Sequence, residues 1–510
     1  MDKIAVIDIG SNSIKLVLAI YNKHGFQIID EIKESVRLGE DMDQNDYMKQ
    51  DRIQKALETL KMFKGLCKKT NTEKIIAVGT AAVREATNQK EFLKRVKEET
   101  GLNIKVLSGK KEAFYDYCGV VNSIDKRNGI IIDIGGGSIE LTRMKDRKVE
   151  NIKSFSFGAV TLSSMFDLKD NIKSSSVNKL NEFLKKEFDK LEWLKKENFK
   201  TFIGVGGTIR NIARINKRKK DYPFKRMHNY KMNKEEVKEV FELVSSKDYK
   251  GRRKISGLSK KRADIFVGAN SFVYELMNYL DINDLLISGK GIREGILYNE
   301  KILNSHIVED VLDYSISEQM DKISTFKSHM ENVYELLNIL VFKLEDLYSF
   351  EFSEFNGSVF KIVKTAGLLH DLGSIIDYYN HHEHTFYMIL NSNINGINHR
   401  EQLIAAFIAA SHRHKRYKLH KYNLNRKTFT SIINRKGKDK EMIRKTGILL
   451  EIAESLDRNM SGDISIEDIN IKSDSVEIKV SSINNPKLEI SDALEVKKGF
   501  KSKFKKDLVI

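Results

Sequence analysis

Apolar residues in the first quarter of the chain follow strand and helix periods in turn. An unbroken apolar run at residues 3–9 indicates a buried strand. Short apolar runs predict further strands at residues 14–20, 26–29, 74–78 and 103–107. Helical spacing of apolar residues predicts helices at about 51–67 and 111–122. This order indicates a mixed module of strands and helices.

The pattern of this module starts again at residue 129. Residues 129–133 predict a strand that enters the glycine-rich turn 134–138, and another strand follows at about 139–143. The same succession of strand, aspartate, glycine-containing turn and strand occurs at residues 4–18. The repeat predicts two related lobes. The second lobe continues with a helix that opens at 204–208, a helix near 262–280 and a strand at 284–288.

After about residue 304 the pattern becomes almost wholly helical until about residue 459. From residue 469 it changes to a period of two, because Val476, Ile478 and Val480 alternate with polar residues, as do Leu488 and Ile490. This period predicts a small β-rich tail. We therefore divide the chain into domains 1–125, 126–303, 304–465 and 466–510.

Length and composition narrow the class of protein. A chain of 510 residues is long enough for several domains, and no apolar run approaches the roughly 18 to 20 residues that span a bilayer. The first residues carry an acid inside an apolar run and lack the build of a signal peptide, so we expect a cytoplasmic protein. Cys67 and Cys118 are too few for a disulfide framework and are expected to be buried thiols.

Charge adds a clue about partners. Lys and Arg total 88 against 71 Asp and Glu, a net charge of +17. Such an excess favours a polyanion such as polyphosphate, nucleic acid, an anionic lipid surface or a nucleotide, although solvated lysine faces are equally compatible with it. Basic residues cluster at 217–226, 252–262, 412–445 and 497–506.

Two turns have the build of phosphate-binding loops. In Asp8–Ser13 and in Asp133–Ser138, an apolar strand delivers an aspartate to a turn with glycine and hydroxyl-bearing residues. Glycine lets backbone N–H groups approach an anion closely, and Ser or Asn side chains add donors. The aspartates would repel phosphate, so we expect them to hold Mg²⁺ or its water ligands. One such turn is weak evidence, whereas two matching turns predict a phosphate cradle.

Around these loops the chain resembles a known family. The matching segments are DIGSNSIKL at 8–16, VGTAAVREATN at 78–88, VLSGKKEAFYDYCGV at 106–120, IDIGGGSIEL at 132–141, SFGAVTL at 156–162, GVGGTIRNIA at 204–213 and SGKGIREGIL at 288–297. In this order they resemble the exopolyphosphatase/guanosine pentaphosphate phosphohydrolase (Ppx/GppA) family of the actin and sugar kinase superfamily. The helical region resembles the HD-type third domain of its long members.

The resemblance implies an α/β fold with two actin-like, ribonuclease H-like lobes flanking a cleft, then an all-α HD-like domain and the β-rich tail. It implies a homodimer and a hydrolase that uses Mg²⁺ or Mn²⁺. By resemblance, Glu112 is the general base and Arg84 clamps phosphate. Asp133 and Glu140 organise the metal ion, with Asp8 as a further member. The expected phosphate-binding residues are Gly10, Ser11, Asn12, Ser13, Gly135, Gly136, Gly137 and Ser138.

The helical region contains a second candidate metal site. His370 and Asp371 form the HD dyad, and with His329 and Asp457 they could enclose one divalent ion. Further candidate ligands are His381, His382, His384 and His412. The competing interpretation is that these histidines pack and hydrogen-bond inside a helical bundle. Nearby basic residues are expected to hold a long polyanion: Arg413, Lys415, Arg416 and Lys418.

We therefore expect a cytoplasmic exopolyphosphatase that removes terminal phosphate from inorganic polyphosphate. Guanosine pentaphosphate phosphohydrolase is the nearest alternative, because it uses the same chemistry on a nucleotide. A sugar or acetate kinase would need ATP and an acceptor. A non-catalytic module that binds a polyanion would not need the acids Glu112, Asp133 and Glu140. Nucleic acid is not expected as the main partner.

Overall fold

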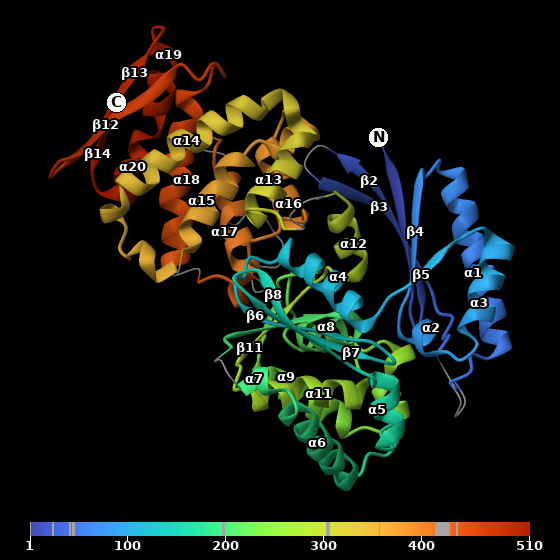
Figure 1. Ribbon diagram of the computed structural model, residues 1–510. Helices are drawn as coiled ribbons and strands as arrows, with labels where there is room; N and C mark the ends of the chain where they lie inside the picture. Colours follow the sequence, from blue (N-terminus) through green and yellow to red (C-terminus); the bar gives the residue numbers. More distant parts are fainter. Residues whose placement is uncertain are drawn as a thin grey trace. The chain divides into compact units, whose positions relative to one another are not determined.

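The computed structural model divides the chain into two compact units, Met1–Glu309 and Asp310–Ile510 (Figure 1). It describes residues 2–22, 25–39, 42, 46–195, 199–301, 307–355, 357–413, 429–434 and 437–510. No helix among these residues is long and apolar enough to cross a membrane. The finer domain boundaries expected inside each unit stay predictions.

The first lobe of unit 1 is built on a five-stranded sheet of order β3-β2-β1-β4-β5. Its strands are β1 (Lys3–Ile9), β2 (Ile14–Asn22), β3 (Gly25–Glu34), β4 (Lys74–Gly79) and β5 (Ile104–Val106). β1 pairs antiparallel with β2 and parallel with β4, so the chain reverses at the β1–β2 turn. The helices of this lobe are α1 (Gln50–Lys69), α2 (Ala81–Glu85) and α3 (Gln89–Thr100).

The second lobe repeats this topology in a sheet of order β10-β11-β9-β6-β7-β8. Its strands are β6 (Gly129–Ile134), β7 (Ile139–Lys145), β8 (Lys148–Phe155), β9 (Thr201–Val205), β10 (Lys231–Asn233) and β11 (Asp284–Ile287). Strands β8-β7-β6-β9-β11 correspond in order to β3-β2-β1-β4-β5, with β10 added at the edge. The two related actin-like lobes expected from the sequence repeat are therefore confirmed.

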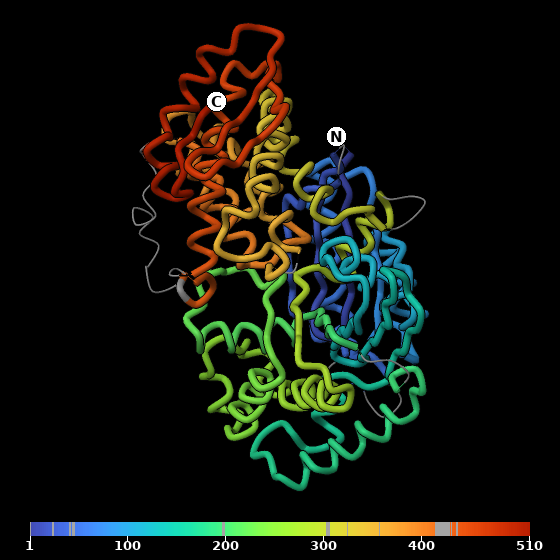
Figure 2. Tube along the Cα trace, turned by 90° about the vertical axis from the view of Figure 1, so that its left-hand side faces the viewer, coloured from blue at the N-terminus to red at the C-terminus, as the bar shows by residue number. Residues whose placement is uncertain are grey.

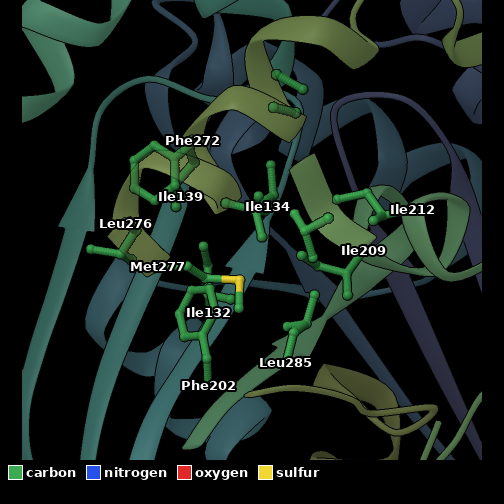
Figure 3. Packing of buried hydrophobic residues seen from close by; sticks show 14 of the residues in the cluster. Ile132, Ile134, Ile139, Phe202, Ile209, Ile212, Phe272, Leu276, Met277 and Leu285 are labelled. Atoms are coloured by element: carbon green, nitrogen blue, oxygen red, sulfur yellow. The ribbon is translucent and has the colours of Figure 1, made fainter. Parts of the chain in front are cut away.

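Helices cover the second sheet and complete its core. They are α5 (Ala159–Met165), α6 (Ser174–Asp189), α7 (Glu192–Lys195), α8 (Gly206–Lys219), α9 (Lys234–Ser245), α10 (Tyr249–Arg252) and α11 (Phe266–Tyr279). Figure 3 shows Ile132 and Phe202 of the sheet meeting Ile209 of α8 and Met277 of α11. Each of these side chains is fully buried, so burial of apolar surface holds this lobe together.

Helix α4 (Gly109–Val121) packs on both sheets, together with α12 (Ile292–Lys301). Tyr115 joins the apolar cluster of β1 and β4, whereas Cys118 joins that of β6 and β9. The two helices approach at glycines: a Cβ atom on Gly119 would lie 2.6 Å from the carbonyl oxygen of Gly291, and one on Gly295 would lie 1.7 Å from that of Tyr115. Close packing therefore fixes the helix whose first turn carries Glu112.

Unit 2 consists of a helical domain and a small sheet, as expected. Its helices are α13 (Val311–Met320), α14 (Lys327–Lys343), α15 (Ser358–Leu368), α16 (His381–Asn391), α17 (His399–Ala409), α18 (Lys438–Leu456), α19 (Lys487–Ala493) and α20 (Lys497–Phe504). The sheet contains β12 (Ile464–Ile471), β13 (Ser475–Ser482) and β14 (Asp507–Val509) in that order. Figure 2 shows these strands in red next to the C-terminus.

One strand expected in the tail is wrong. Leu488 and Ile490 lie in the helix α19, which follows Pro486. Two apolar residues separated by one polar residue are too short a pattern to distinguish the two periods, and the fixed φ of proline suits the start of a helix. Both cysteines, Cys67 and Cys118, are buried free thiols as predicted.

Candidate active site

Equivalent turns join the first two strands of each lobe. In the β1–β2 turn, the N–H group of Gly10 donates to the carbonyl oxygen of Ser13 at 3.2 Å. In the β6–β7 turn, the N–H group of Gly135 donates to the carbonyl oxygen of Ser138 at 2.9 Å. The other residues predicted to bind phosphate lie in the same turns: Ser11, Asn12, Gly136 and Gly137.

The two turns lie against each other. A Cβ atom added to Gly136 would lie 3.2 Å from the Cβ atom of Ser11, and one added to Gly137 would lie 3.5 Å from the Ser11 hydroxyl oxygen. A larger residue in the second turn would therefore fill space beside the first turn. The structure thus brings together both loops whose sequences predict a phosphate cradle.

The acids of the two loops have different cross-strand partners. Asp8 lies opposite Lys15 and forms an ion pair with it, Oδ2 to Nζ 3.1 Å. At the equivalent position of the second lobe, Asp133 lies opposite another acid, Glu140. Like charges directly opposite each other on paired strands are unfavourable, and more so when they are buried. The second lobe therefore carries an acidic pair that a bound cation would stabilise.

Unpartnered oxygen atoms of this pair fit a divalent ion. In the described part of the chain, Oδ1 of Asp133 and Oε2 of Glu140 are buried without a hydrogen-bond partner. The other oxygen of Glu140 accepts from the Ser154 hydroxyl at 2.8 Å. Gly206, with a φ of 85°, leaves room for Asp133, since a Cβ atom there would lie 2.0 Å from Oδ1. Carboxylate oxygens are the ligands that Mg²⁺ and Mn²⁺ favour.

Glu112 and Arg84, both predicted site residues, are in direct contact. Ser108 caps α4 by accepting the N–H group of Lys111 at 3.3 Å, which places Glu112 in the first helical turn. Nη1 of Arg84 donates to Oε2 of Glu112 at 3.0 Å and to the carbonyl oxygen of Leu107 at 3.0 Å. Arg84 therefore orients the carboxylate of Glu112.

Buried acids around Glu112 repel one another. Burial, together with the charges of Asp133 and Asp8, raises the pKa of Glu112 to about 7 against the opposing hydrogen bond and charge of Arg84. Burial also raises the pKa values of Asp116, Asp133 and Glu140, and nearby acids add to each shift. Asp116 was not predicted from the sequence as a member of this acidic group. The sequence does contain a signal for it, because Asp116 follows Glu112 by four residues and both side chains therefore lie on one face of α4.

Cationic side chains oppose this acidic cluster. Burial raises the pKa of Asp133 above its usual value, and the positive charges of Lys15, Arg210 and Arg262 oppose part of this rise. Burial, together with the charges of Arg262, Lys15 and Arg210, lowers the pKa of Lys33 to about 8. These residues therefore form a basic group beside the acids. The sequence assigned no role to Lys33 or Arg210, because they come from different lobes and only folding brings them together.

Other members of the basic runs serve the fold. Arg252 is fully buried and donates to the carbonyl oxygen of Ala263 at 2.9 Å. Lys217 is buried and donates to the carbonyl oxygen of Arg226 at 2.8 Å. Lys261 is exposed, and its Nζ donates to the Ser35 hydroxyl at 2.9 Å. A basic run in the sequence therefore mixes structural and surface cations.

Glu140→Gln is expected to stabilise the metal-free protein. The pKa of Glu140 is raised in the folded state, so its ionised form destabilises that state once the pH exceeds its unfolded pKa of about 4.3. A neutral amide removes this cost, which we expect to raise Tm by about 2–4 °C at pH 8 and not at pH 4. Calorimetry in chelator measures the change. The exposed Glu58→Gln is the control, and an unchanged or lower Tm at pH 8 would contradict the account.

Unit 2 brings most of its predicted ligands together. His329, His370 and Asp371 converge with Glu454, and Asp371 also lies close to His381 and His412. Burial lowers the pKa of His412 to about 3 against the charges of Glu454 and Asp371, so its imidazole is neutral. This buried cluster could bind metal.

Asp457, the predicted fourth ligand, lies behind the cluster. Its Oδ2 is 2.8 Å from Nδ1 of His329, and its Oδ1 accepts the N–H group of Gly462 at 2.8 Å. Glu454, three residues earlier on α18, takes the place facing the other ligands. The sequence offered a signal for this residue, since Glu454 precedes Asp457 by three residues, a spacing that makes the two side chains neighbours at the end of the helix.

Only one residue of the predicted polyanion-binding set is described. The guanidinium Nε of Arg413 lies 3.4 Å from Nε2 of His381, and the guanidinium carbon lies 4.9 Å from the centre of the Tyr378 ring. Lys415, Arg416 and Lys418 lie outside the described residues. Their predicted role stays a prediction.

Comparison with known proteins relates this architecture to a family. The model of the Ppx/GppA phosphatase family matches residues 6–304, and the model of Ppx/GppA phosphatase, domain III, matches residues 315–495. A crystal structure of the Aquifex aeolicus Ppx/GppA family member has 30% sequence identity and a TM-score of 0.54, covering 60% of this chain and 99% of that one.

Curated relatives carry different names. A bifunctional 3-dehydroquinate synthase/phosphatase of Fusobacterium nucleatum is 31% identical over 56% of this chain, which spans only 44% of that protein's length. A guanosine-5'-triphosphate,3'-diphosphate pyrophosphatase of Pseudoalteromonas translucida is 25% identical over 80% of both chains. A Haemophilus influenzae protein provisionally named as an exopolyphosphatase is 28% identical over 58% of this chain and 91% of its own.

The two-lobed unit with its paired loops and the helical unit that follows thus each match the corresponding part of one family. This chain belongs to the Ppx/GppA phosphatase family.

Proposed function

We propose that this chain is an exopolyphosphatase, which hydrolyses the terminal phosphate of inorganic polyphosphate. The observation that carries the proposal is the pair of the buried Glu112 and the half-buried Arg84, which lies within the same group of charges as Asp133 and Glu140. Hydrolysis of a phosphoanhydride needs a base for water, positive charge on the transferred phosphoryl group and exact positioning. This set of residues offers each of the three.

In the proposed step, Glu112 accepts a proton from water. The water oxygen bonds to the terminal phosphorus, and the bond from that phosphorus to the bridging oxygen breaks. The shortened chain leaves with the electron pair of that bond, and inorganic phosphate is released. A carboxylate with a pKa of about 7 is matched to this task, because it is partly ionised at neutral pH and still basic enough to take the proton.

Arg84 has two roles in this proposal. Its Nη1 holds Glu112, and its remaining donors can bind the oxygen atoms of the phosphoryl group. Asp133 and Glu140, with Asp8 nearby, would hold Mg²⁺ or Mn²⁺. When bound, such an ion neutralises negative charge on phosphate oxygens. The N–H groups of the two turns would orient the chain end.

Substrate choice rests on the basic group. Electrostatic interactions join Lys15, Lys33, Arg210 and Arg262 to one another or to the acids, and Lys261 interacts with Lys33 in the same way. Several cations suit a chain with one negative charge on each phosphate, whereas a nucleotide needs a smaller basic patch. Guanosine pentaphosphate hydrolysis is the second candidate, because the relative that aligns over most of both chains is named for such a nucleotide.

Parallel assays separate the two substrates. Phosphate release would be measured with Mg²⁺ from long-chain polyphosphate and from guanosine pentaphosphate at equal concentrations of chain ends. We expect a kcat/KM at least about tenfold higher for polyphosphate, because the basic group adds attraction along the polymer. A preference for the nucleotide would replace the proposed substrate, and a requirement for a phosphoryl acceptor would indicate a kinase.

The double variant Lys33→Gln/Lys261→Gln tests the basic group. We expect it to lower kcat/KM about tenfold for long polyphosphate and about twofold for tripolyphosphate, since a short chain cannot reach as many cations. Steady-state kinetics at low and high salt measure the difference. Lys254→Gln, which removes an exposed charge from the same basic run, is the control. Equal losses on both substrates would contradict a path for the polymer at these residues.

A further inference from the structure

We propose that unit 2 binds two divalent metal ions that share the carboxylate of Asp371. Two sets of ligand atoms overlap at this residue, and the atoms of each set lie within 4.8 Å of one another. The first set is His329, His370, Asp371 and Glu454, and the second is Asp371, His381 and His412. This inference concerns a site separate from the proposed phosphatase residues, all of which lie in unit 1.

Three of the imidazoles are fixed in one tautomer. Nδ1 of His370, His381 and His412 lies 2.7, 2.8 and 2.5 Å, respectively, from the backbone carbonyl oxygen three residues earlier. A carbonyl oxygen only accepts hydrogen bonds, so each Nδ1 carries the proton. In a neutral ring, Nε2 then presents its lone pair. Hydrogen bonding of one ring nitrogen in this way orients the other nitrogen toward a metal ion.

In the second set these lone pairs face each other. Nε2 of His381 lies 2.7 Å from Nε2 of His412, and both Nδ1 atoms already hold their protons. Oδ1 of Asp371 lies 3.1 Å from the first of these nitrogens and 3.6 Å from the second. Two lone pairs and a carboxylate at these distances repel one another unless a positive charge lies among them, and the Arg413 guanidinium reaches only the first nitrogen, with its Nε 3.4 Å from Nε2 of His381. A metal ion supplies that charge.

In the first set, a carboxylate oxygen and two ring nitrogens also lie close together. Oε2 of Glu454 lies 2.7 Å from Nε2 of His370 and 3.4 Å from Nε2 of His329. Both nitrogens and this oxygen are buried and lack a well-aligned hydrogen bond among the described residues. Asp457 holds His329 from behind at 2.8 Å, an arrangement that orients a metal-binding imidazole.

The carboxylate of Asp371 faces both sets. Its Oδ2 is 3.9 Å from Nε2 of His329, and its Oδ1 is 3.9 Å from Nε2 of His370 and 3.1 Å from Nε2 of His381. A carboxylate that lies between two sets of nitrogens can bridge two ions. Carboxylates bridge in this way in two-metal sites with ions about 3.5–4 Å apart.

The ligands also predict the class of metal ion. Four of the six residues in the two sets are histidines. Imidazole favours ions such as Fe²⁺, Ni²⁺ and Zn²⁺ over Mg²⁺, and the carboxylates of Asp371 and Glu454 also suit Mn²⁺. The ligands come from α14, α16, α18 and the residues after α15 and α17, so the helical bundle itself builds the site. By contrast, the candidate metal ligands of unit 1 are all carboxylates.

The test measures bound metal in the full chain. Protein is loaded with Mn²⁺, excess ion is removed, and manganese per chain is determined by mass spectrometry. Relative to wild type, Asp371→Asn should lose two ions, whereas His412→Ala and Glu454→Gln should each lose one. His384→Ala, a histidine on α16 outside both sets, should lose none. These differences exclude any ion held by unit 1, which all variants share.

Electron paramagnetic resonance supplies the second readout. Two manganese ions that share a carboxylate give a spin-coupled signal, which we expect in wild type. His412→Ala should convert it to the signal of an isolated ion, and circular dichroism confirms that each variant is folded. Loss of only one ion in Asp371→Asn, or a wild-type spectrum without the spin-coupled signal, would overturn the pair. Equal metal content in all variants would show that a shared proton, not metal, joins His381 and His412.

Discussion

Replacement of Glu112 by glutamine is expected to slow phosphate release at least about 100-fold, the scale of a lost general base. Glutamine keeps the shape of the side chain and can still accept from Arg84, but it cannot take a proton from water. Binding of polyphosphate should remain close to that of wild type. In wild type, kcat/KM should fall about tenfold per pH unit below about pH 7, because protonated Glu112 is inactive.

The neighbouring acid Glu85 is the control for this variant. Its Oε1 lies 3.2 Å from Nη2 of the same Arg84, but its side chain is exposed. Glu85→Gln should therefore keep the rate within about twofold, as expected of an exposed ion pair. A rate for Glu112→Gln equal to that of wild type would remove Glu112 from the mechanism.

Arg84→Gln is expected to lower kcat/KM by about 100-fold or more, because an arginine on the transferred phosphoryl group contributes strongly to phosphoryl transfer. The variant should also move the acidic limb of the pH profile upward. The charge and hydrogen bond of Arg84 lower the pKa of Glu112 against its burial, so their removal raises that pKa further above 7. Steady-state kinetics from pH 5 to 9 measure both effects.

Arg84→Lys separates the two roles of this residue. Lysine keeps the charge but not the planar fork, so we expect a large loss of rate with a smaller shift of the pH profile. Arg95→Lys, at a half-buried arginine that pairs with Glu99 on the helix α3, is the control and should change neither. If Arg84→Gln left the pH profile in place, Arg84 would not set the pKa of Glu112.

The sequence was sufficient to predict the two lobes because their strands are apolar and their loops repeat. The register of β6 and β7, in which Asp133 faces Glu140, follows from the tight turn between them. Strand alternation failed at Leu488 because two apolar residues cannot define a period. The motif glycines Gly119 and Gly295 were read as part of a family resemblance, whereas the structure shows that they let α4 and α12 approach.

Two features of the candidate sites depend on tertiary contacts, which the sequence could not show. Lys33 and Arg262 are more than two hundred residues apart, and only the packing of the lobes makes their charges interact. Glu454 and Asp457 were hard to distinguish because both are acids on one end of α18. Their roles depend on the rotation of that helix, which places Asp457 behind His329 and Glu454 in front of it.

The most direct test of the central claim is polyphosphate hydrolysis in water enriched in oxygen-18. A single turnover with wild type and Mg²⁺ should place one labelled oxygen in the released phosphate and none in the shortened chain, and Glu112→Gln should release almost no labelled phosphate in the same time. Label at the end of the shortened chain, unlabelled phosphate, or labelled phosphate from Glu112→Gln at the wild-type rate would contradict attack on the terminal phosphorus by a water that Glu112 activates.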